Sequence, residues 1–344
     1  MAGKKKDVVD KERESRLHET LAAIKKSNPD LVIGTGDEIE TELTFIPSGI
    51  SYFDDFIGGG WPRSRFSVVG GPKGSGKSTL VLSSIANAQK NGCTCVYADL
   101  ENTFDPRWAK NLGVDTDALI HLKGRTAEDV LDALLALYDS KVIDLVVIDS
   151  VTALAPKGEL ETKDGKQRSL EDDTIGLIAR KLSQFFRMAC GRNALSKCAT
   201  IMVAQVRNDI NSYGGGLTIT GGNALQHYNS LTLTIRRGAK SEAPKAGDEL
   251  IGFNMVISID KTKLNNQEGR KLNMPFLHGS GISTRLLIID TAVALGIIKK
   301  SGAWFEFEGQ RMQGIQAVIE NTTNEQLKTL EKLIREKEKH DVRH

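Results

Sequence analysis

Short apolar runs alternate with helix-like patterns through the middle of the chain, from about residue 43 to about residue 289. Each apolar run has a length suited to a strand, and the segments between them show the spacing of amphipathic helices. Alternation of this kind is typical of a largely parallel sheet with helices packed on its faces. The runs that predict strands are Phe66–Val69, Cys95–Leu100, Leu145–Asp149, Thr200–Ala204, Leu231–Arg236 and Phe253–Asp260.

The pattern changes on both sides of this central region. A charged amphipathic helix is predicted from about Asp10 to Lys26, and the apolar run Leu31–Ile33 is a candidate strand. After residue 289 the chain shows a helical pattern, then the run Ala303–Phe307, then a charged helix over about 324–339. We therefore predict three parts: a helix and strand segment over 1–42, an α/β core over 43–289, and a small C-terminal α/β domain over 290–344.

Composition and charge set only broad limits. Hydrophobic residues make up 40% of the 344 positions, and the net charge is +2, so contact with a polyanion must come from a local arrangement. The N-terminal lysines have no apolar stretch behind them, and no run approaches the ~18 apolar residues of a membrane span. We expect a cytoplasmic protein without membrane contact. The lack of paired CxxC motifs favours free thiols over zinc at Cys93, Cys95, Cys190 and Cys198.

The most specific motif lies between the run Phe66–Val69 and the helical run Leu80–Lys90. It satisfies G-x-x-x-x-G-K-[ST], in which glycines let backbone N–H groups wrap around phosphate oxygens and the helix N-terminus adds partial positive charge. Lys77 is expected to reach the β- and γ-phosphates, and the Ser78 hydroxyl is expected to bind Mg²⁺. The predicted nucleotide-binding residues of the loop are Gly71, Pro72, Lys73, Gly74, Ser75, Gly76, Lys77, Ser78 and Thr79.

Acidic residues end two of the predicted strands. Asp149 ends a buried apolar run, where ligands bind in open parallel sheets, and is expected to hold Mg²⁺ through its water shell. Glu101 follows another run and is the candidate that polarises the attacking water, with Asp99 competing for that role. These residues predict an ATPase with a phosphate loop that uses ATP and Mg²⁺. They do not define its biological role.

Several longer segments resemble the RecA family of recombinases. They follow the family's order and extend from about residue 17 to about residue 333, and they resemble both bacterial members and phage recombinases. The resemblance implies an α/β, RecA-like ATPase core with a mainly parallel twisted sheet, between the two small flanking parts. The matching segments are Asp99–Asp115, Ile148–Lys157, Thr220–Leu225, Arg236–Arg237, Leu295–Ile298 and Ser301–Phe305.

The resemblance assigns further roles at the nucleotide site. Glu101 would be the catalytic glutamate, Trp108 would stack against adenine, and Asp105 would contact the edge of the base. Gln205 would sense the γ-phosphate, because an amide can bind a phosphate oxygen and move when that oxygen leaves. A DNA-binding loop of the family begins directly after Gln205, so ATP state and DNA binding would share one element.

Assembly is implied by a different group of residues. Lys261 and Lys263 match a Lys-x-Lys pair that, in this family, reaches the ATP of the neighbouring subunit and would stabilise developing charge in trans. Alternate residues at a strand end share one face, so both ammonium groups could meet one phosphate group. The segment 1–42 would dock on the next subunit, which gives an open helical filament.

Two loops would bind DNA, one over about 159–174 and one over about 206–222. Isoleucines would act as wedges between bases, while arginines and backbone N–H groups would bind phosphates. Such contacts predict binding that depends strongly on salt and weakly on sequence. The residues assigned to DNA are Ile175, Arg180, Arg187, Arg207, Ile210, Gly221, Gly222 and Asn223.

The resemblance therefore implies an ATP-dependent homologous recombinase. It would form a helical filament on single-stranded DNA and exchange strands with double-stranded DNA during repair. Single-strand-binding and mediator proteins are further candidate partners. His227 departs from the bacterial pattern, which has an aromatic residue there that packs into the neighbour.

Two other functions remain as alternatives. A hexameric helicase would share the phosphate loop, but the Lys-x-Lys pair and the C-terminal domain argue against it. A RecA-like regulatory or mediator protein would bind DNA or a true recombinase without hydrolysing ATP. The complete set of predicted catalytic residues argues against that reading.

Overall fold

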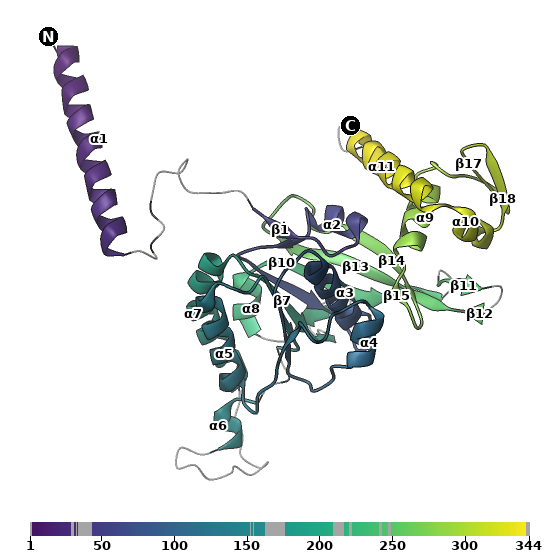
Figure 1. Ribbon diagram of the computed structural model, residues 1–344, viewed down its shortest axis with the longest axis horizontal. Coiled ribbons are helices and arrows are strands. Elements are labelled where there is room, and N and C mark those ends of the chain that lie inside the picture. The colour runs from purple at the N-terminus through teal and green to yellow at the C-terminus, as the bar shows by residue number, and fades with distance from the viewer. Residues whose placement is uncertain are drawn as a thin grey trace. The chain divides into compact units, whose positions relative to one another are not determined.

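The computed structural model describes residues 2–28, 31, 33, 43–151, 153, 155–161, 176–208, 217–219, 222–240, 243–246 and 249–341. The chain divides into two compact units, Met1–Thr44 and Phe45–His344. The first unit contains α1 (Ala2–Ser27), which covers the predicted N-terminal helix and begins before it (Figure 1). The strand expected over Leu31–Ile33 stays a prediction, because Val32 lies outside the described residues.

Nine strands of the second unit form one sheet, in the order β15-β14-β13-β10-β3-β7-β6-β4-β5. The six strands from β10 to β5 are parallel, and β13, β14 and β15 extend the sheet in antiparallel fashion. All six predicted strands occur in this sheet, which confirms the predicted α/β fold. The bounds are β3 (Phe66–Gly70), β4 (Cys95–Asp99), β5 (Ile120–Leu122), β6 (Leu145–Asp149), β7 (Ala199–Ala204), β10 (Asn229–Arg237), β13 (Gly252–Thr262), β14 (Lys271–Leu277) and β15 (Gly281–Ile282).

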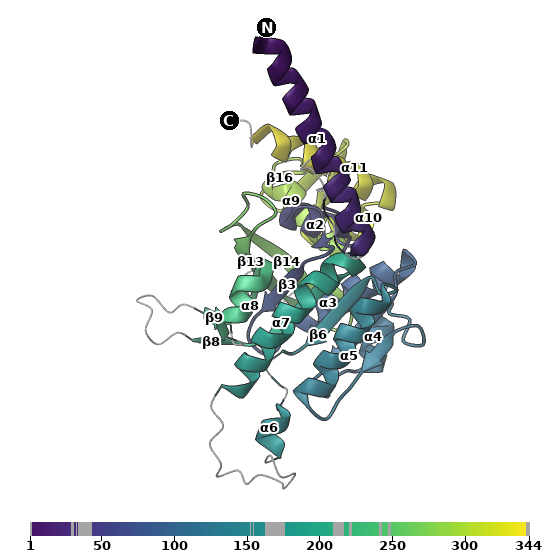
Figure 2. The same ribbon diagram turned by 90° about the vertical axis from the view of Figure 1, so that its left-hand side faces the viewer.

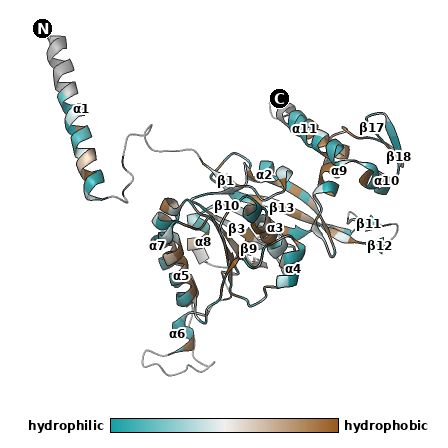
Figure 3. Cartoon of the chain, viewed as in Figure 1, coloured by the Kyte–Doolittle hydropathy of each residue, from teal (hydrophilic) through white to brown (hydrophobic). Residues whose placement is uncertain are grey.

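Each face of the parallel strands has its own hydrophobic core, because successive side chains point to opposite faces. One core joins α3 (Lys77–Lys90) to one face of the sheet, and the other joins α5 (Ala127–Ser140) and α7 (Leu177–Ser196) to the opposite face. Figures 1 and 2 show this arrangement, and Figure 3 shows the hydrophobic residues of the central strands. Every residue of β3, β4, β6 and β7 is buried, as expected for strands covered on both faces.

The C-terminal part of this unit has a third core. It is built on α9 (Thr284–Ala294), α10 (Ile315–Asn321) and α11 (Asn324–Asp341), with the antiparallel sheet β16 (Lys299–Ser301), β17 (Trp304–Phe307) and β18 (Gln310–Gln313). An ion pair of 2.6 Å between Arg335 and Asp55 joins α11 to α2 (Ser51–Ile57). The remaining elements are α4 (Pro106–Asn111), α6 (Lys157–Leu160), α8 (Gly222–Tyr228), β1 (Phe45–Ile46), β2 (Trp61–Pro62), β8 (Val206–Asn208), β9 (Leu217–Ile219), β11 (Lys245–Ala246) and β12 (Glu249–Leu250).

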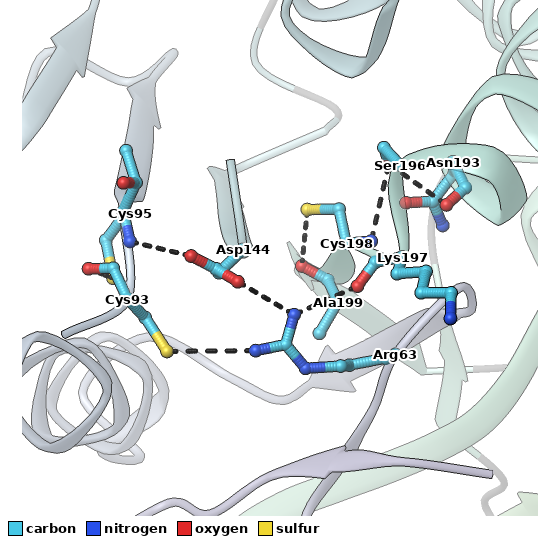
Figure 4. Close-up of polar contacts among 10 residues, drawn as sticks. Arg63, Cys93, Cys95, Asp144, Asn193, Ser196, Lys197, Cys198 and Ala199 are labelled. Atoms are coloured by element: carbon cyan, nitrogen blue, oxygen red, sulfur yellow. Dashed lines mark hydrogen bonds and ion pairs between the residues drawn. The ribbon is translucent and has the colours of Figure 1, made fainter. Parts of the chain in front are cut away.

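One ion pair joins the amino ends of four central strands (Figure 4). Arg63, which precedes β3, donates to Asp144 Oδ1 at 2.8 Å and to the Lys197 carbonyl at 3.1 Å. Its other terminal nitrogen lies 3.8 Å from Cys93 Sγ, and Asp144 Oδ2 accepts the Thr94 N–H at 2.9 Å. The residues before β3, β4, β6 and β7 are thus tied to one guanidinium and one carboxylate.

None of the four cysteines, all of which the structure describes, forms a disulfide bond. Burial is the main cause that raises the pKa of each thiol above its ordinary value, so the thiolate form is disfavoured at every position. Cys93, Cys95 and Cys198 lie near the ion pair in Figure 4 and act there as small core residues.

Candidate nucleotide-binding site

The loop between β3 and α3 has the tight course that its glycines predict. Gly74 and Gly76 have φ values of 73° and 97°, a region that residues with side chains rarely adopt. A Cβ atom on Gly71 would lie 2.3 Å from the Ile235 carbonyl oxygen, and one on Gly76 would lie 2.8 Å from Met255 Sδ. The loop therefore passes so close to β10 and β13 that larger residues do not fit.

Lys77, at the start of α3, folds back over this loop. Its ammonium donates hydrogen bonds to the carbonyl oxygens of Gly71, at 2.8 Å, and Pro72, at 2.9 Å. Burial lowers the pKa of Lys77, and the nearby carboxylates of Asp149 and Glu101 oppose that shift. The cation that the sequence assigns to the phosphates is thus held directly at the loop that would cradle them.

Ser78 and Asp149 meet at the carboxyl end of β6. Ser78 Oγ donates to Asp149 Oδ2 at 2.8 Å, and the Tyr97 hydroxyl donates to the same oxygen at 2.7 Å. Burial raises the pKa of the Asp149 carboxyl, while these two hydrogen bonds act to lower it. Hydroxyl and carboxylate oxygens are ligands that Mg²⁺ prefers, so the pair fits the predicted metal position. Tyr97 was not predicted, because its apolar strand gives no signal that separates it from a core residue.

Glu101 and Gln205 are also brought together. Gln205 Nε2 donates to Glu101 Oε1 at 3.0 Å. The two residues follow β4 and β7, which are separated in the sheet by β6, so the contact spans the end of the strand that carries Asp149. The sequence assigned both residues to the nucleotide site without predicting that they touch.

Asp99, the alternative to Glu101 as the catalytic carboxylate, has a different environment. It is 2% exposed, and its carboxylate accepts the backbone N–H groups of Thr103, at 3.0 Å, and Phe104, at 3.2 Å. It also lies 3.5 Å from His121 Nε2 and 3.4 Å from Lys123 Nζ. Its oxygens therefore hold the turn that presents the glutamate two residues later.

The residues assigned to the base lie on α4, next to the phosphate loop. Asp105 caps this helix, with one carboxylate oxygen accepting the N–H groups of Arg107, at 2.9 Å, and Trp108, at 3.3 Å. Trp108 Nε1 donates to Thr79 Oγ1 at 3.2 Å. A Cβ atom on Gly281, where φ is 82°, would lie 3.8 Å from the indole ring of Trp108. The indole therefore lies between the start of α3 and the first residue of β15.

A cavity of about 280 Å³ lies beside the loop and includes residues that the sequence analysis missed. Arg237 Nε donates to the Gly74 carbonyl at 2.9 Å, and its guanidinium carbon lies 4.1 Å from the centre of the Phe253 ring. Phe253 stacks on Phe276 at 4.5 Å. These residues lie on strands outside the motif G-x-x-x-x-G-K-[ST], so the motif could not have identified them. The cavity is lined by Gly74, Gly76, Lys77, Ser78, Thr79, Arg237, Phe253, Phe276 and His278.

The two lysines assigned to catalysis in trans bind the last turn of α8. Lys261 Nζ donates to the Gln226 carbonyl and, at 3.0 Å, to Asn229 Oδ1. Lys263 Nζ donates to the His227 carbonyl at 3.0 Å. Carbonyls at a helix C-terminus attract cations, so both ammonium groups have favourable partners there. Both ammonium groups thus lie at α8, and their reach to a neighbouring subunit's phosphate group stays a prediction.

The residues assigned to DNA are described only in part. Arg180 and Arg187 are exposed on α7, and Arg187 donates to Ser183 Oγ at 2.9 Å. Of the two loops, the structure describes 159–161 in the first and 206–208, 217–219 and 222 in the second. β8 and β9 pair in antiparallel fashion directly after Gln205. Ile175, Ile210 and Gly221 lie outside the described residues, as do the side chains of Arg207 and Asn223, while Gly222 is described as the first residue of α8.

A glycine-rich loop between a parallel strand and a helix, with an acid at a nearby strand end, defines a nucleotide-binding protein of the phosphate-loop class. The RecA N-terminal domain family matches residues 15–283, and the RecA C-terminal domain family matches residues 287–339. The chain belongs to the RecA family.

Individual relatives agree with this assignment. Protein RecA of Mycobacterium marinum is 37% identical over 334 residues, which are 95% of this chain and 93% of the relative. Protein RecA of Bifidobacterium longum is 37% identical over 321 residues, 92% of this chain and 78% of the relative. Protein RecA of a Nocardioides species is 38% identical over 304 residues, 88% of this chain and 84% of the relative.

The predicted family, fold and biological role are thereby confirmed. The protein is a recombinase that takes part in recombinational DNA repair and strand exchange. Family membership implies a nucleotide-binding, DNA-dependent ATPase that binds DNA and assembles with copies of itself. Within the part of the chain that the structure describes, no helix is both long enough and apolar enough to cross a membrane.

Proposed function

We propose that each subunit hydrolyses ATP to ADP and phosphate, with Mg²⁺, while assembled in a filament on single-stranded DNA. The 3.0 Å hydrogen bond from Gln205 to Glu101 carries this proposal. Gln205 immediately precedes β8, one of the described ends of the second predicted DNA loop. DNA that orders this loop would therefore act on the side chain that contacts the candidate catalytic carboxylate.

The chemistry follows from the groups around the loop. Glu101 would accept a proton from water as the water oxygen bonds to the γ-phosphorus and the bond to the β–γ bridging oxygen breaks. The Lys77 ammonium would offset the negative charge that develops on the β- and γ-phosphates. Mg²⁺ held by Ser78 and Asp149 would neutralise a further part of that charge. Trp108 would stack on the base.

Lys261 and Lys263 would complete the site of a neighbouring subunit. Both ammonium groups contact the end of α8, the helix that follows the second DNA loop. A phosphate group of the neighbour would compete with these carbonyls for the same cations. Assembly, hydrolysis and the DNA loop would thereby be linked through one short helix.

DNA would be held mainly through its phosphates. Arg180 and Arg187 are seven residues apart on α7, and hence on one face of that helix. The two loops would add the wedge and backbone contacts predicted from the sequence. Single-stranded DNA would lie in the filament and pair with double-stranded DNA, so base pairing rather than the protein would recognise sequence. Single-strand-binding and mediator proteins stay predicted partners.

Hydrolysis of ATP should be measured with and without single-stranded DNA over a range of protein concentrations. The variants are Lys77→Ala, Lys263→Ala and, as a matched control, Lys90→Ala, which removes an exposed lysine in the last turn of α3. We expect strong stimulation by DNA and a steep dependence on protein concentration in the wild type and K90A. Both should be lost in K77A and K263A.

Two results would contradict the proposal. If ATP hydrolysis is absent, or if its rate does not change when DNA is added, the mediator function would be favoured instead. Hydrolysis that K263A retains in full at low protein concentration would show that catalysis is complete within one subunit.

A further inference from the structure

Tyr97 is a buried residue of β4 whose hydroxyl reaches the candidate metal site from within the sheet. It is 2% exposed, and its hydroxyl donates to Asp149 Oδ2 at 2.7 Å. Ser78 Oγ donates to the same oxygen at 2.8 Å. One carboxylate oxygen thus has two hydroxyl donors, one from β4 and one from α3.

The Tyr97 ring is fixed by its neighbours, so its hydroxyl is a donor in a defined place. The ring centroid lies 5.1 Å from that of Phe104, which lies 4.6 Å from the ring of His121. The backbone of Phe104 is in turn held by the buried Asp99 carboxylate. A side chain packed in this way loses little further freedom when it makes its hydrogen bond.

The two donors differ in what a bound cation would do to them. Ser78 is the proposed ligand of Mg²⁺, so its hydroxyl oxygen would be shared with the ion. Tyr97 is not a proposed ligand of the ion, and it is buried within the core that packs α3 against the sheet. Its hydrogen bond is therefore the one that can orient Asp149 both before and after the ion arrives.

We infer that Tyr97 is a positioning residue that holds the Asp149 carboxylate in the orientation needed to bind the water shell of Mg²⁺. The inference rests on the proposed function, in which Ser78 and Asp149 form the magnesium site. Groups that orient metal-binding residues typically contribute 10–100-fold to metal affinity. Because Ser78 remains as a second donor, we expect the lower end of that range.

The test is Tyr97→Phe, which removes one oxygen and keeps the packed ring. The probe is a fluorescent ADP analogue, titrated with Mg²⁺ and, separately, measured in EDTA. Y97F should need about 10-fold more Mg²⁺ for half-maximal binding, whereas its affinity for the analogue in EDTA should stay within about twofold of wild type. A purely structural defect would weaken binding under both conditions.

Tyr138→Phe is the matched control. Tyr138 is a fully buried tyrosine of α5 whose hydroxyl pairs with Thr200 Oγ1 at 2.8 Å. Y138F should be destabilised like Y97F, by loss of one buried hydrogen bond, without any change in its Mg²⁺ requirement. Thermal unfolding of both variants would show that they are folded.

The outcomes separate this inference from the function on which it rests. A wild-type Mg²⁺ requirement in Y97F, or equal weakening in EDTA, would overturn the role of Tyr97 and leave the magnesium site intact. In an Asp149→Asn background, Y97F should change the Mg²⁺ requirement by less than about twofold. A further rise of about 10-fold in that background would show that Tyr97 does not act through Asp149. Binding of the analogue by wild type without any effect of Mg²⁺ would overturn the magnesium site itself, and this inference with it.

Discussion

Replacing Gly71 by alanine would test whether the shape of the phosphate loop determines its affinity for nucleotide. The added Cβ atom would lie 2.3 Å from the Ile235 carbonyl oxygen and 2.8 Å from Ser75 Oγ. Carbon and oxygen atoms in ordinary close contact are ~3.3 Å apart, so the loop or the carbonyl must move by about 1 Å. Ile235 lies in β10, which pairs with strands on both sides, so the loop should move.

The expected loss of ATP hydrolysis follows from that displacement. A shift of about 1 Å in a reacting geometry costs on the order of 100-fold, which corresponds to about 2.7 kcal/mol. We expect DNA-stimulated ATP hydrolysis by G71A to fall about 100-fold, and its affinity for ADP with Mg²⁺ to fall by more than about threefold. Fluorescence titration gives the affinity, and circular dichroism shows whether the variant is folded.

Gly92→Ala is the control for the general cost of replacing a glycine. Gly92 has a φ of 79°, and no atom lies within 4 Å of the Cβ that would be added. G92A should therefore lose about 1 kcal/mol of stability through its backbone conformation and keep its affinity for ADP. The reasoning would be refuted if G71A bound ADP within threefold of wild type, or if G92A lost as much affinity as G71A.

Two further predictions concern stability. Arg63→Ala and Asp144→Ala should each lower the thermal unfolding temperature, and a double-mutant cycle should give a coupling of about 1 kcal/mol, because both side chains are partly exposed; a coupling near zero would contradict this. Burial raises the pKa of Asp54 from 3.8 to about 6, so the folded protein holds a proton that the unfolded chain releases. Its contribution to stability is complete below about pH 4 and is lost as pH rises through about 6. Asp54→Asn should flatten the pH dependence of urea unfolding between about pH 4 and 6, and an unchanged slope would show that another group is responsible.

The parts of the site that could be predicted are those whose signal is local. The phosphate loop is consecutive in sequence, and Lys77 and Ser78 follow from its pattern. Asp149 and Glu101 could be placed because the carboxyl ends of parallel strands meet at one edge of a sheet. The environment of Asp99 needed coordinates, since only the structure shows its carboxylate turned to backbone N–H groups.

The contacts that could not be predicted join residues from separate elements. Tyr97 is paired in register with Val147, two positions before Asp149, and no apolar pattern gives that register. Arg237 reaches the loop from the end of β10, the outermost of the parallel strands, and His278 lines the cavity from the turn after β14, in the antiparallel extension. Strand direction is not encoded in short apolar runs, so this extension was not predicted either.

The ion pair between Arg63 and Asp144 has a mechanical consequence for the sheet. It ties the amino ends of β3, β4, β6 and β7, whereas the nucleotide-site residues follow the carboxyl ends of the same strands. The two margins of the sheet are therefore held by separate sets of contacts, with the ion pair at the amino ends and the hydrogen bonds among the nucleotide-site residues at the carboxyl ends. A change in the contacts at the carboxyl margin when ATP binds would therefore leave the alignment of the strands at the amino margin in place.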